Sequence, residues 1–310
     1  VRAITSMDDN FVDTIPWIFV EKMTVMDNVL ALAGGVGGSK LVVGLSNVVP
    51  TDKLTVVVNT GDDDRFHGLH VSPDIDTVMY ALAGMTNETT GWGLNGDSFR
   101  TLERLQVYGA DVWFQLGDLD LATHIRRTEL LDDGATLSEV TKLLCMSIGI
   151  KQNIAPMTDG RVRTVIDTDQ GLLSFQEYFV KHKCEPKLLN IDFEGIDSAQ
   201  ISNGFAQALD NCNALVISPS NPYVSIDPIL SINTVREKIQ NLFESKKILP
   251  SNKFTLSALQ KTDLVNKKYK KIKILGKGNI KTKLDAEVNF ISKPAKEKIE
   301  KLGGKITLIK

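Results

Sequence analysis

The stretch that decides the fold reads Leu-Ala-Leu-Ala-Gly-Gly-Val-Gly-Gly-Ser-Lys, residues 30–40. A short apolar run, Val29 to Ala33, enters the glycine cluster, and an amphipathic segment beginning at Leu41 leaves it. This order predicts a strand, a tight turn and the start of a helix. Glycine lets the backbone adopt positive φ and approach a ligand closely, and the free N–H groups of a helix start suit a phosphate. Two interpretations stay open: a phosphate-binding turn and a plain turn between strand and helix.

The glycine cluster departs from two common phosphate-binding patterns. It is not a Walker A loop, because no Gly-Lys-Ser/Thr follows at the required spacing. It is not the dinucleotide fingerprint, because Lys40 stands where the third glycine belongs. In the phosphate interpretation, Ser39 adds a hydroxyl and Lys40 a cation to the backbone N–H groups.

Two further apolar runs, Leu54–Asn59 and Ala214–Ser218, are typical of buried parallel strands. Helical patterns separate the runs, so the sequence predicts an α/β fold with a Rossmann-like open parallel sheet. In such sheets the ligand binds at the carboxyl ends of the strands. The segment Thr136-Leu-Ser-Glu139 has the pattern of a capping box. Helices are expected over residues 39–47, 74–84, 97–108, 136–147 and 198–209.

Polar loops follow the second and third predicted strands. Residues 59–64, Asn-Thr-Gly-Asp-Asp-Asp, place three carboxylates next to the predicted phosphate site. Mg²⁺ is usually held by one or two carboxylates together with phosphate oxygens. We therefore expect Mg²⁺ as a cofactor with Asp62 and Asp63 as its ligands, against the alternative of an acidic turn that faces water. The loop 218–222, Ser-Pro-Ser-Asn-Pro, either presents groups of Ser220 and Asn221 to a nucleotide or simply connects two elements.

A second acidic segment, Ser72-Pro-Asp-Ile-Asp-Thr77, precedes one of the predicted helices. Ser72 or Asp74 is expected to cap that helix. For Asp76 a structural and a functional role stay open.

Residues 116–124, Leu-Gly-Asp-Leu-Asp-Leu-Ala-Thr-His, carry a third group of ionisable side chains. In one interpretation Asp118, Asp120 and His124 face one site. In the other, Asp120 caps a helix and His124 lies on the surface of that helix.

Charge divides the chain near residue 240. Residues 240–310 hold 18 lysines, no arginine and six acidic residues, whereas residues 1–239 hold 18 basic and 32 acidic residues. So sharp a break predicts two segments of different origin or role. The three cysteines have no metal-ligand or disulfide spacing, which predicts free thiols in a reducing compartment. No apolar run approaches the ~20 residues that span a membrane, and no signal-peptide pattern precedes the first strand. We therefore expect a cytoplasmic protein.

Set together, these motifs resemble the 2-phospho-L-lactate transferases of coenzyme F420 biosynthesis and their bacterial phosphoenolpyruvate-using relatives. The resemblance covers about residues 26–238, in order and in register. It is carried by residues 34–40, 57–60, 72–77, 116–124, 156–159, 175–176, 218–222 and 225–230.

The resemblance implies a transferase reaction. A guanosine diphosphate that carries lactyl or enolpyruvyl on its β-phosphate meets the deazaflavin FO, whose terminal ribityl hydroxyl attacks the β-phosphorus, and GMP leaves with the assistance of Mg²⁺. Such a reaction needs positioning and charge neutralisation more than covalent catalysis. The resemblance implies catalytic roles for Asp62, Asp63 and Asp76. It implies ligand contacts for Gly35, Gly37, Gly38, Ser39, Lys40, Asn59, Asp76, Gln115, Asp118, His124, Ser220 and Asn221.

Two positions depart from the family pattern. Gln115 and Leu119 stand where many members have Lys and Arg. Both changes remove positive charge, and the sequence leaves the choice between a lactyl and an enolpyruvyl donor open. It also leaves open whether the chain forms a homodimer.

The lysine-rich tail resembles the C-terminal part of bacterial ribosomal protein L15 through residues 265–278, 292–300 and 303–306. The resemblance implies a small α/β module with a strand at 272–275, a helix at 293–301 and a strand at 305–309. It also implies contact with ribosomal RNA, since a lysine-rich surface suits a phosphate backbone. The alternative is a solvated basic face without a specific partner.

We expect three segments: an N-terminal extension over residues 1–25, before the first predicted strand, and, from the two resemblances, a phospholactate-transferase-like domain over 26–239 and the L15-like tail over 240–310. Family members continue past the Ser-Asn-Pro loop with further strands that we do not find after Ile239. Three interpretations follow: an F420-pathway transferase with an accidental tail, an RNA-binding chain with a nucleotide-binding front, and a splice of two fragments, neither of them fully functional. For activity we adopt the third as a hypothesis, because a sheet that loses its neighbours is left with unpaired edges.

Overall fold

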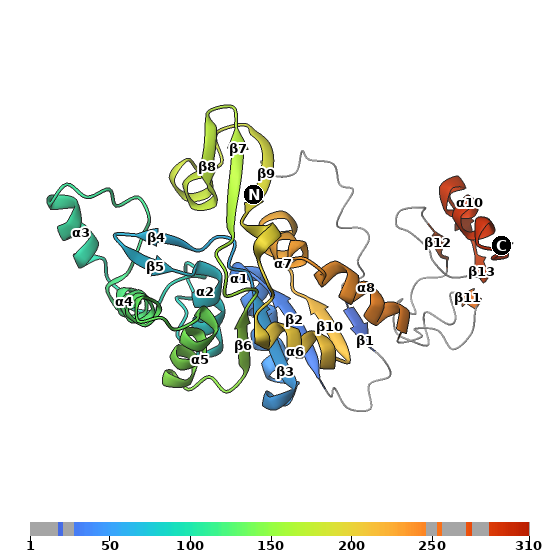
Figure 1. Ribbon diagram of the computed structural model, residues 1–310, viewed down its shortest axis with the longest axis horizontal. Coiled ribbons are helices and arrows are strands. Elements are labelled where there is room, and N and C mark those ends of the chain that lie inside the picture. Colours follow the sequence, from blue (N-terminus) through green and yellow to red (C-terminus); the bar gives the residue numbers. More distant parts are fainter. Residues whose placement is uncertain (1–17, 21–27, 246–252, 256–270, 275–284, 310) are drawn as a thin grey trace. The chain divides into compact units, whose positions relative to one another are not determined.

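The computed structural model describes residues 18–20, 28–245, 253–255, 271–274 and 285–309. Contacts between residues divide the chain into two compact units, residues 25–238 and residues 1–24 with 239–310. Figure 1 shows the elements of both units.

The larger unit is built on a parallel sheet whose strands lie in the order β10-β2-β3-β6 (Figure 1). The strand β2 (Val29–Ala33) lies between β3 (Leu54–Val58) and β10 (Ala214–Ile217), and β6 (Asn153–Pro156) pairs with β3. Almost every residue of these strands is buried, as expected for a parallel sheet that is covered on both faces. The predicted α/β fold with a parallel sheet is confirmed, and so is the strand at 29–33; the other two predicted strands end one residue early.

Helices cover both faces of this sheet. On one face α1 (Gly35–Ser46), α2 (Pro73–Leu82) and α5 (Leu137–Ser147) pack against alternate strand residues. The remaining strand residues, such as Leu30 and Leu32, are also fully buried, and α6 (Asn203–Asn211) contacts β2, β3 and β6. The capping box predicted at Thr136 and Glu139 is present. All five predicted helices occur, although α1 begins before and α6 after the predicted start.

The connections between parallel strands carry additional elements that the sequence analysis did not predict. Between β3 and β6 lies an antiparallel hairpin, β4 (Asp64–Phe66) and β5 (Leu69–Val71), and α4 (Asp118–Asp132) follows the predicted helix α3 (Arg100–Val107). Between β6 and β10 lies an antiparallel sheet in the order β8-β7-β9. Its strands are β7 (Arg163–Thr168), β8 (Gly171–Ser174) and β9 (Leu188–Glu194). The remaining helices of the unit are η2 (Thr51–Lys53), η3 (Glu177–Lys181), η4 (Ile196–Ser198), η5 (Pro222–Ile226), α7 (Asp227–Ser231) and α8 (Val235–Ser245). The helix α8 continues past the unit boundary at residue 238.

The smaller unit contains β1 (Ile18–Val20) and the described part of the lysine-rich tail. Three tail strands form a parallel sheet in the order β11-β13-β15, and β12 pairs with β14. The helix α10 (Lys293–Lys301) matches the predicted helix 293–301, and the two predicted strands are present as β12 and β15. The strand bounds are β11 (Lys253–Thr255), β12 (Lys273–Ile274), β13 (Asp285–Val288), β14 (Phe290–Ile291) and β15 (Ile306–Leu308).

Candidate active site

The glycine turn after β2 packs tightly against the loop after β10. The Gly34 N–H donates to Ser220 Oγ at 3.1 Å, and that hydroxyl donates to the Gly34 carbonyl at 2.7 Å. A Cβ on Gly38 would lie 2.7 Å from Ser220 Oγ, and one on Gly37 would overlap the Pro219 carbonyl oxygen. The glycines therefore make room for the protein's own backbone, and the two loops predicted to share the carboxyl edge of the sheet do meet there.

Asp74, in the first turn of α2, directs its carboxylate to the N-terminus of α1. Its carboxylate accepts the backbone N–H of Gly35, which has a φ of +60°, and the side-chain amide of Asn59 at 3.0 Å. A Cβ on Gly34 would lie 2.6 Å from Asp74 Oδ2. Burial raises the pKa of Asp74 to about 6, although both hydrogen bonds oppose the shift. A carboxylate of the protein thus already uses the helix N-terminus at which we predicted a phosphate, and an anion is favoured there by the helix dipole.

The predicted helix cap on α2 is wrong. Ser72 stands at the N-cap position, but its side chain makes no capping hydrogen bond. The Ser72 hydroxyl instead donates to Asp63 Oδ2 at 2.7 Å, and Asp74 points to α1. Both side chains are therefore committed to the acidic loop and the glycine turn.

Asn59 ties the acidic loop to its surroundings. It is completely buried; its amide nitrogen lies 3.0 Å from Asp74 Oδ2 and 3.3 Å from both Asp62 Oδ1 and the Val224 carbonyl, and its oxygen accepts the Gly61 N–H. Both polar atoms of the Asn59 side chain, which we predicted to bind ligand, therefore already make hydrogen bonds within the protein. Asn59 holds two carboxylates close to each other at the end of β3.

Asp62 and Asp63 lie inside the protein and do not form an acidic turn that faces water. Asp62 is only 7% exposed and accepts the Gln176 amide at 3.2 Å. Asp63 Oδ1 is buried and has no hydrogen-bond partner among the described residues. Burial, reinforced by neighbouring carboxylates, raises the pKa of both residues well above the ordinary range. Carboxylates in this situation favour a bound cation or a proton.

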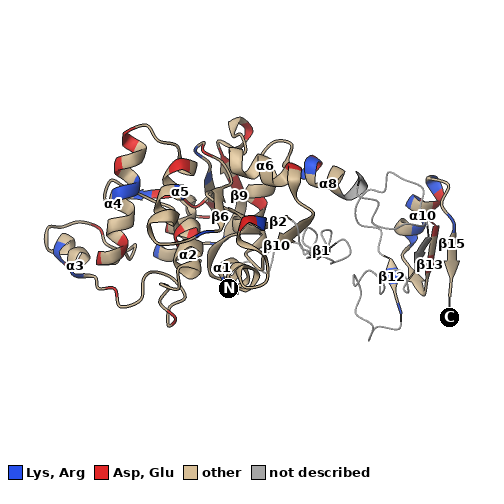
Figure 2. Ribbon diagram, turned by 90° about the horizontal axis from the view of Figure 1, so that it is seen from below, with Lys and Arg blue, Asp and Glu red and all other residues tan. Residues whose placement is uncertain are grey.

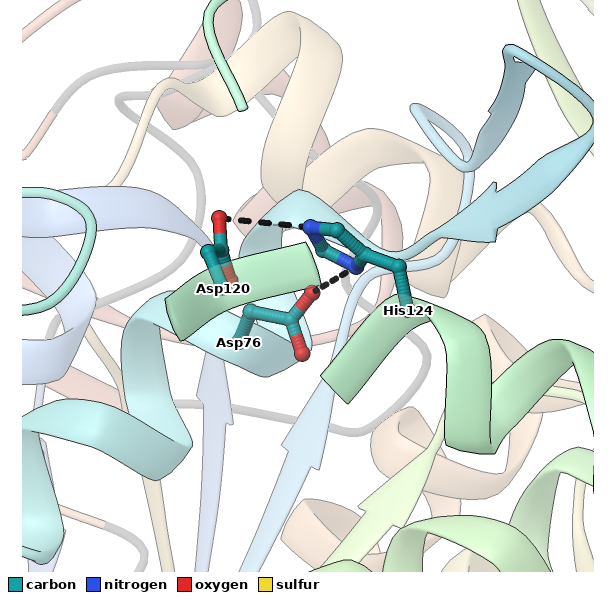
Figure 3. Close-up of side chains that lie close together, drawn as sticks. All are labelled: Asp76, Asp120 and His124. Atoms are coloured by element: carbon teal, nitrogen blue, oxygen red, sulfur yellow. Dashed lines mark ion pairs between the residues drawn. The ribbon is translucent and has the colours of Figure 1, made fainter. Parts of the chain in front are cut away.

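Asp76 lies behind this loop in a network that the sequence analysis did not foresee. Both of its oxygens accept hydrogen bonds from the Arg127 guanidinium, which is completely buried. Figure 3 shows the imidazole of His124 between Asp76 and Asp120: Nδ1 lies 3.7 Å from Asp76 Oδ2 and Nε2 lies 3.2 Å from Asp120 Oδ2. The Tyr80 hydroxyl donates to Asp120 at 2.5 Å. Asp76 is thereby fixed through both oxygens.

The group of Asp118, Asp120 and His124 is split by the structure. Asp120 and His124 share the buried network, and His124 is only 1% exposed, so the interpretation that places His124 on a helix surface is wrong. Asp118 turns the other way and accepts hydrogen bonds from the Ser98 hydroxyl and from two N–H groups at the start of α3. The Ser98 hydroxyl makes the largest contribution to a lowered Asp118 pKa.

The remaining predicted ligand-binding residues lie near the glycine turn or on the lobe of α3 and α4. The Ser39 hydroxyl donates to the Val36 carbonyl, Lys40 is exposed on α1, and Asn221 accepts two N–H groups at the start of η5. Gln115 donates to the Val112 carbonyl at 3.3 Å, next to a stack of Phe66 and Phe114. None of these contacts tests the predicted ligand-binding roles, which stay predictions.

Comparisons with known proteins decide the family. A sequence model of the 2-phospho-L-lactate transferase CofD family matches residues 29–300. The chain belongs to this family. The match continues past residue 239, where we expected the family resemblance to end, while the likeness of the tail to ribosomal L15 stays a prediction. Membership makes the chain a transferase enzyme.

Curated relatives are similar over about two thirds of the chain. A 2-phospho-L-lactate transferase of Methanosarcina mazei is 39% identical over 220 residues, which are 71% of each chain. A phosphoenolpyruvate transferase of Streptomyces griseus is 41% identical over 68% of each chain. A crystal structure of a UPF0052 family member from Bacillus halodurans has a TM-score of 0.48 and 15% identity, over 92% of this chain and 88% of that chain. Within the described residues, no helix has the length and apolarity that a membrane span needs.

Arg127 is the residue that the sequence analysis missed. Its partner Asp76 lies 51 residues earlier in the chain, so local spacing carries no sign of the pair. The only signal was its position: Asp120, His124 and Arg127 recur at helical spacing on one face of α4. Ionisable residues that recur at helical spacing on one helix face are therefore candidates for a buried charge network.

Proposed function

We propose that the chain transfers a 2-phospholactyl group, or its enolpyruvyl equivalent, from a guanosine diphosphate-linked donor to the deazaflavin FO in coenzyme F420 biosynthesis. The bond that forms joins the terminal ribityl oxygen of FO to the β-phosphorus. The bond that breaks is the pyrophosphate link, so GMP leaves with the bridging oxygen and the hydroxyl proton is released. Family membership supports the reaction class, and the buried carboxylates at the carboxyl edge of the sheet support its location.

The acidic loop suits a divalent cation. Asp63 has a buried oxygen without a hydrogen-bond partner in the described part of the chain, and burial together with neighbouring carboxylates raises the pKa of Asp62 and Asp63, which supports a cation as their partner. The residues present therefore fit Mg²⁺, which Asp62 and Asp63 would hold. When bound, Mg²⁺ would neutralise the charge of the diphosphate.

The chain's own groups fix this loop from three sides. Gln176 holds one oxygen of Asp62, Ser72 holds one oxygen of Asp63, and Asn59 connects Asp62 to Asp74. Such fixed carboxylates need little reorganisation when a phosphate arrives, which is the main contribution that a phosphoryl-transfer site makes. The glycine turn with Ser220 and Asn221 would bind the donor, and the segment around Gln115 would bind FO.

The test is a turnover assay with the donor, FO and Mg²⁺, in which the product is separated from FO by chromatography. We expect product with the native chain and a loss of about 10²-fold or more with Asp63→Asn, because the isosteric amide removes the charge. Asp111→Asn, at an exposed ion pair with Lys181, is the matched control and should keep the native rate. Absence of product from folded native protein, with both donors tried, would contradict the proposal.

A second activity is proposed for the lysine-rich tail, which would bind a structured RNA through its phosphates. The observation that favours it is the excess of 18 lysines over six acidic residues in residues 240–310. Helix α10 carries four lysines and two glutamates, drawn blue and red in Figure 2. Binding of ribosomal RNA fragments should weaken steeply between 50 and 200 mM salt, roughly as counterion release requires. Binding that does not depend on salt would contradict this second proposal.

A further inference from the structure

In the part of the chain that the structure describes, Arg127 is the one deeply buried cation near the acidic loop. Among the described residues no other Lys or Arg is buried, and Arg127 is 0% exposed. It donates to both oxygens of Asp76, and its NH1 atom also lies 3.3 Å from His124 Nδ1. A cation is taken out of water at this cost only where carboxylates surround it.

We propose that Arg127 is the positioning residue of this active site. It holds Asp76 in a charge-balanced ion pair, so that Asp62 and Asp63, and not Asp76, are the carboxylates that bind a divalent cation. This inference rests on the proposed function for what the active site does. The test measures cation binding alone and does not depend on that function. No sequence pattern and no relative's name assigns a role to Arg127.

The geometry removes Asp76 from ligand binding. A guanidinium that donates to both oxygens of one carboxylate fixes the plane of that carboxylate as well as its charge. On the far side, the His124 ring fills the space between Asp76 and Asp120, with one ring nitrogen toward each (Figure 3). The ligand atoms of Asp76, Asp120 and His124 lie within 4.8 Å of one another, but the imidazole itself bridges the two carboxylates. A bridging ring explains this cluster without a metal ion.

The charge of Arg127 also reaches the acidic loop. It favours the ionised form of Asp63 and opposes protonation of His70, whose pKa falls to about 4 mainly through burial. The Ser72 hydroxyl is the other group that favours ionised Asp63. Arg127 therefore balances Asp76 by contact and offsets part of the charge of Asp63 from a greater distance. We therefore predict that neutralising Arg127 and neutralising Asp76 have opposite effects on the affinity for a divalent cation.

The test is a charge cycle read out by Mn²⁺ binding, followed by electron paramagnetic resonance at pH 8 without substrate. Arg127→Gln leaves one uncompensated negative charge, so we expect Mn²⁺ to bind tighter, on the order of tenfold. Asp76→Asn leaves Arg127 unbalanced, so Mn²⁺ should bind more weakly by a similar factor. The double variant restores the net charge and should return to the native affinity. Arg126→Gln, in an exposed ion pair with Glu129 on the same helix, is the matched control and should change nothing.

Two outcomes would overturn the proposal. If Asp76→Asn and the double variant both lose Mn²⁺ binding, Asp76 is itself a ligand. If none of the folded variants changes Mn²⁺ affinity, Arg127 has only a structural role. Should Arg127→Gln alone fail to fold, the comparison of Asp76→Asn with the double variant still isolates the charge of Arg127. If the variants change the Mn²⁺ affinity as expected but the turnover assay yields no product, the proposed reaction is rejected and this inference is retained.

Discussion

At the scale of single residues, Asp74 explains much of the glycine cluster. Gly34 and Gly35 lie against its carboxylate, which accepts the Gly35 N–H. A side chain at Gly34 would meet both Asp74 and Ser225. The same glycines would suit a bound phosphate, so their presence alone does not distinguish a ligand from an internal carboxylate. Only the contact between residues 34 and 74, far apart in the chain, makes that distinction.

The pH dependence of stability follows from the same carboxylate. Burial raises the Asp74 pKa from 3.8 to about 6, so the folded protein binds a proton that the unfolded chain has already lost between these values. The folded state is therefore penalised above pH 6, and the penalty disappears as the pH falls below 4. For Asp74 alone it is about 3 kcal/mol, from about 1.36 kcal/mol per pKa unit. Asp62 and Asp63, whose pKa values are also raised, add to it with the same sign.

We expect the free energy of unfolding of the native chain, relative to that of Asp74→Asn, to increase as the pH is lowered from 7 to 5 without divalent cations, because the folded native chain binds a proton at Asp74 in this range. Urea titrations of both proteins at pH 7, 6 and 5 measure the difference. Asp118 and His70, whose pKa values are lowered, act in the opposite sense, but they are present in both proteins and cancel in the difference. A difference that stays constant from pH 7 to pH 5 would show that the Asp74 carboxylate is charge-balanced in the native state.

At the scale of elements, α1 carries two kinds of glycine. Gly37 packs against the Pro219 carbonyl, whereas Gly44, on the same helix, has no atom within 4 Å of the position a Cβ would take. We expect Gly37→Ala to lower stability by about 1–3 kcal/mol because the loop after β10 must move. Gly44→Ala should raise stability by about 1 kcal/mol through helix propensity. Thermal unfolding followed by circular dichroism measures both; equal shifts for the two variants would contradict the close packing.

Elements with a strong local signal could be predicted from the sequence, and long-range ones could not. The strand Val29–Ala33 was located correctly because its apolar run is a local pattern, and the bounds of the helix Lys293–Lys301 were taken from the resemblance of the tail to ribosomal L15. The sheet β8-β7-β9 was missed, since its strands are only partly buried and lack a continuous apolar run. In the site, the acidic loop was found by its residue types, but the Arg127–Asp76 pair depends on how α4 packs near α2.

At the scale of the whole molecule, the chain combines two units of different charge and size. Residues 25–238 contain the parallel sheet and the entire candidate site, and residues 239–310 contain the lysine-rich tail. A ligand that binds only one unit should stabilise only that unit, because stabilisation by binding requires a site in the folded state. This gives a way to assign thermal transitions.

We expect calorimetry of the full chain to show two transitions, of which Mg²⁺ shifts one. At a concentration of 100 times the dissociation constant, a ligand adds about 2.7 kcal/mol, which corresponds to a rise of roughly 5–10 °C for a unit of this size. The shifted transition should carry the larger enthalpy, since enthalpy scales with the number of residues that unfold. Asp63→Asn should remove the Mg²⁺ shift and leave the smaller transition where it was. A single transition whose calorimetric and van't Hoff enthalpies agree for all 310 residues would mean that the two units unfold as one.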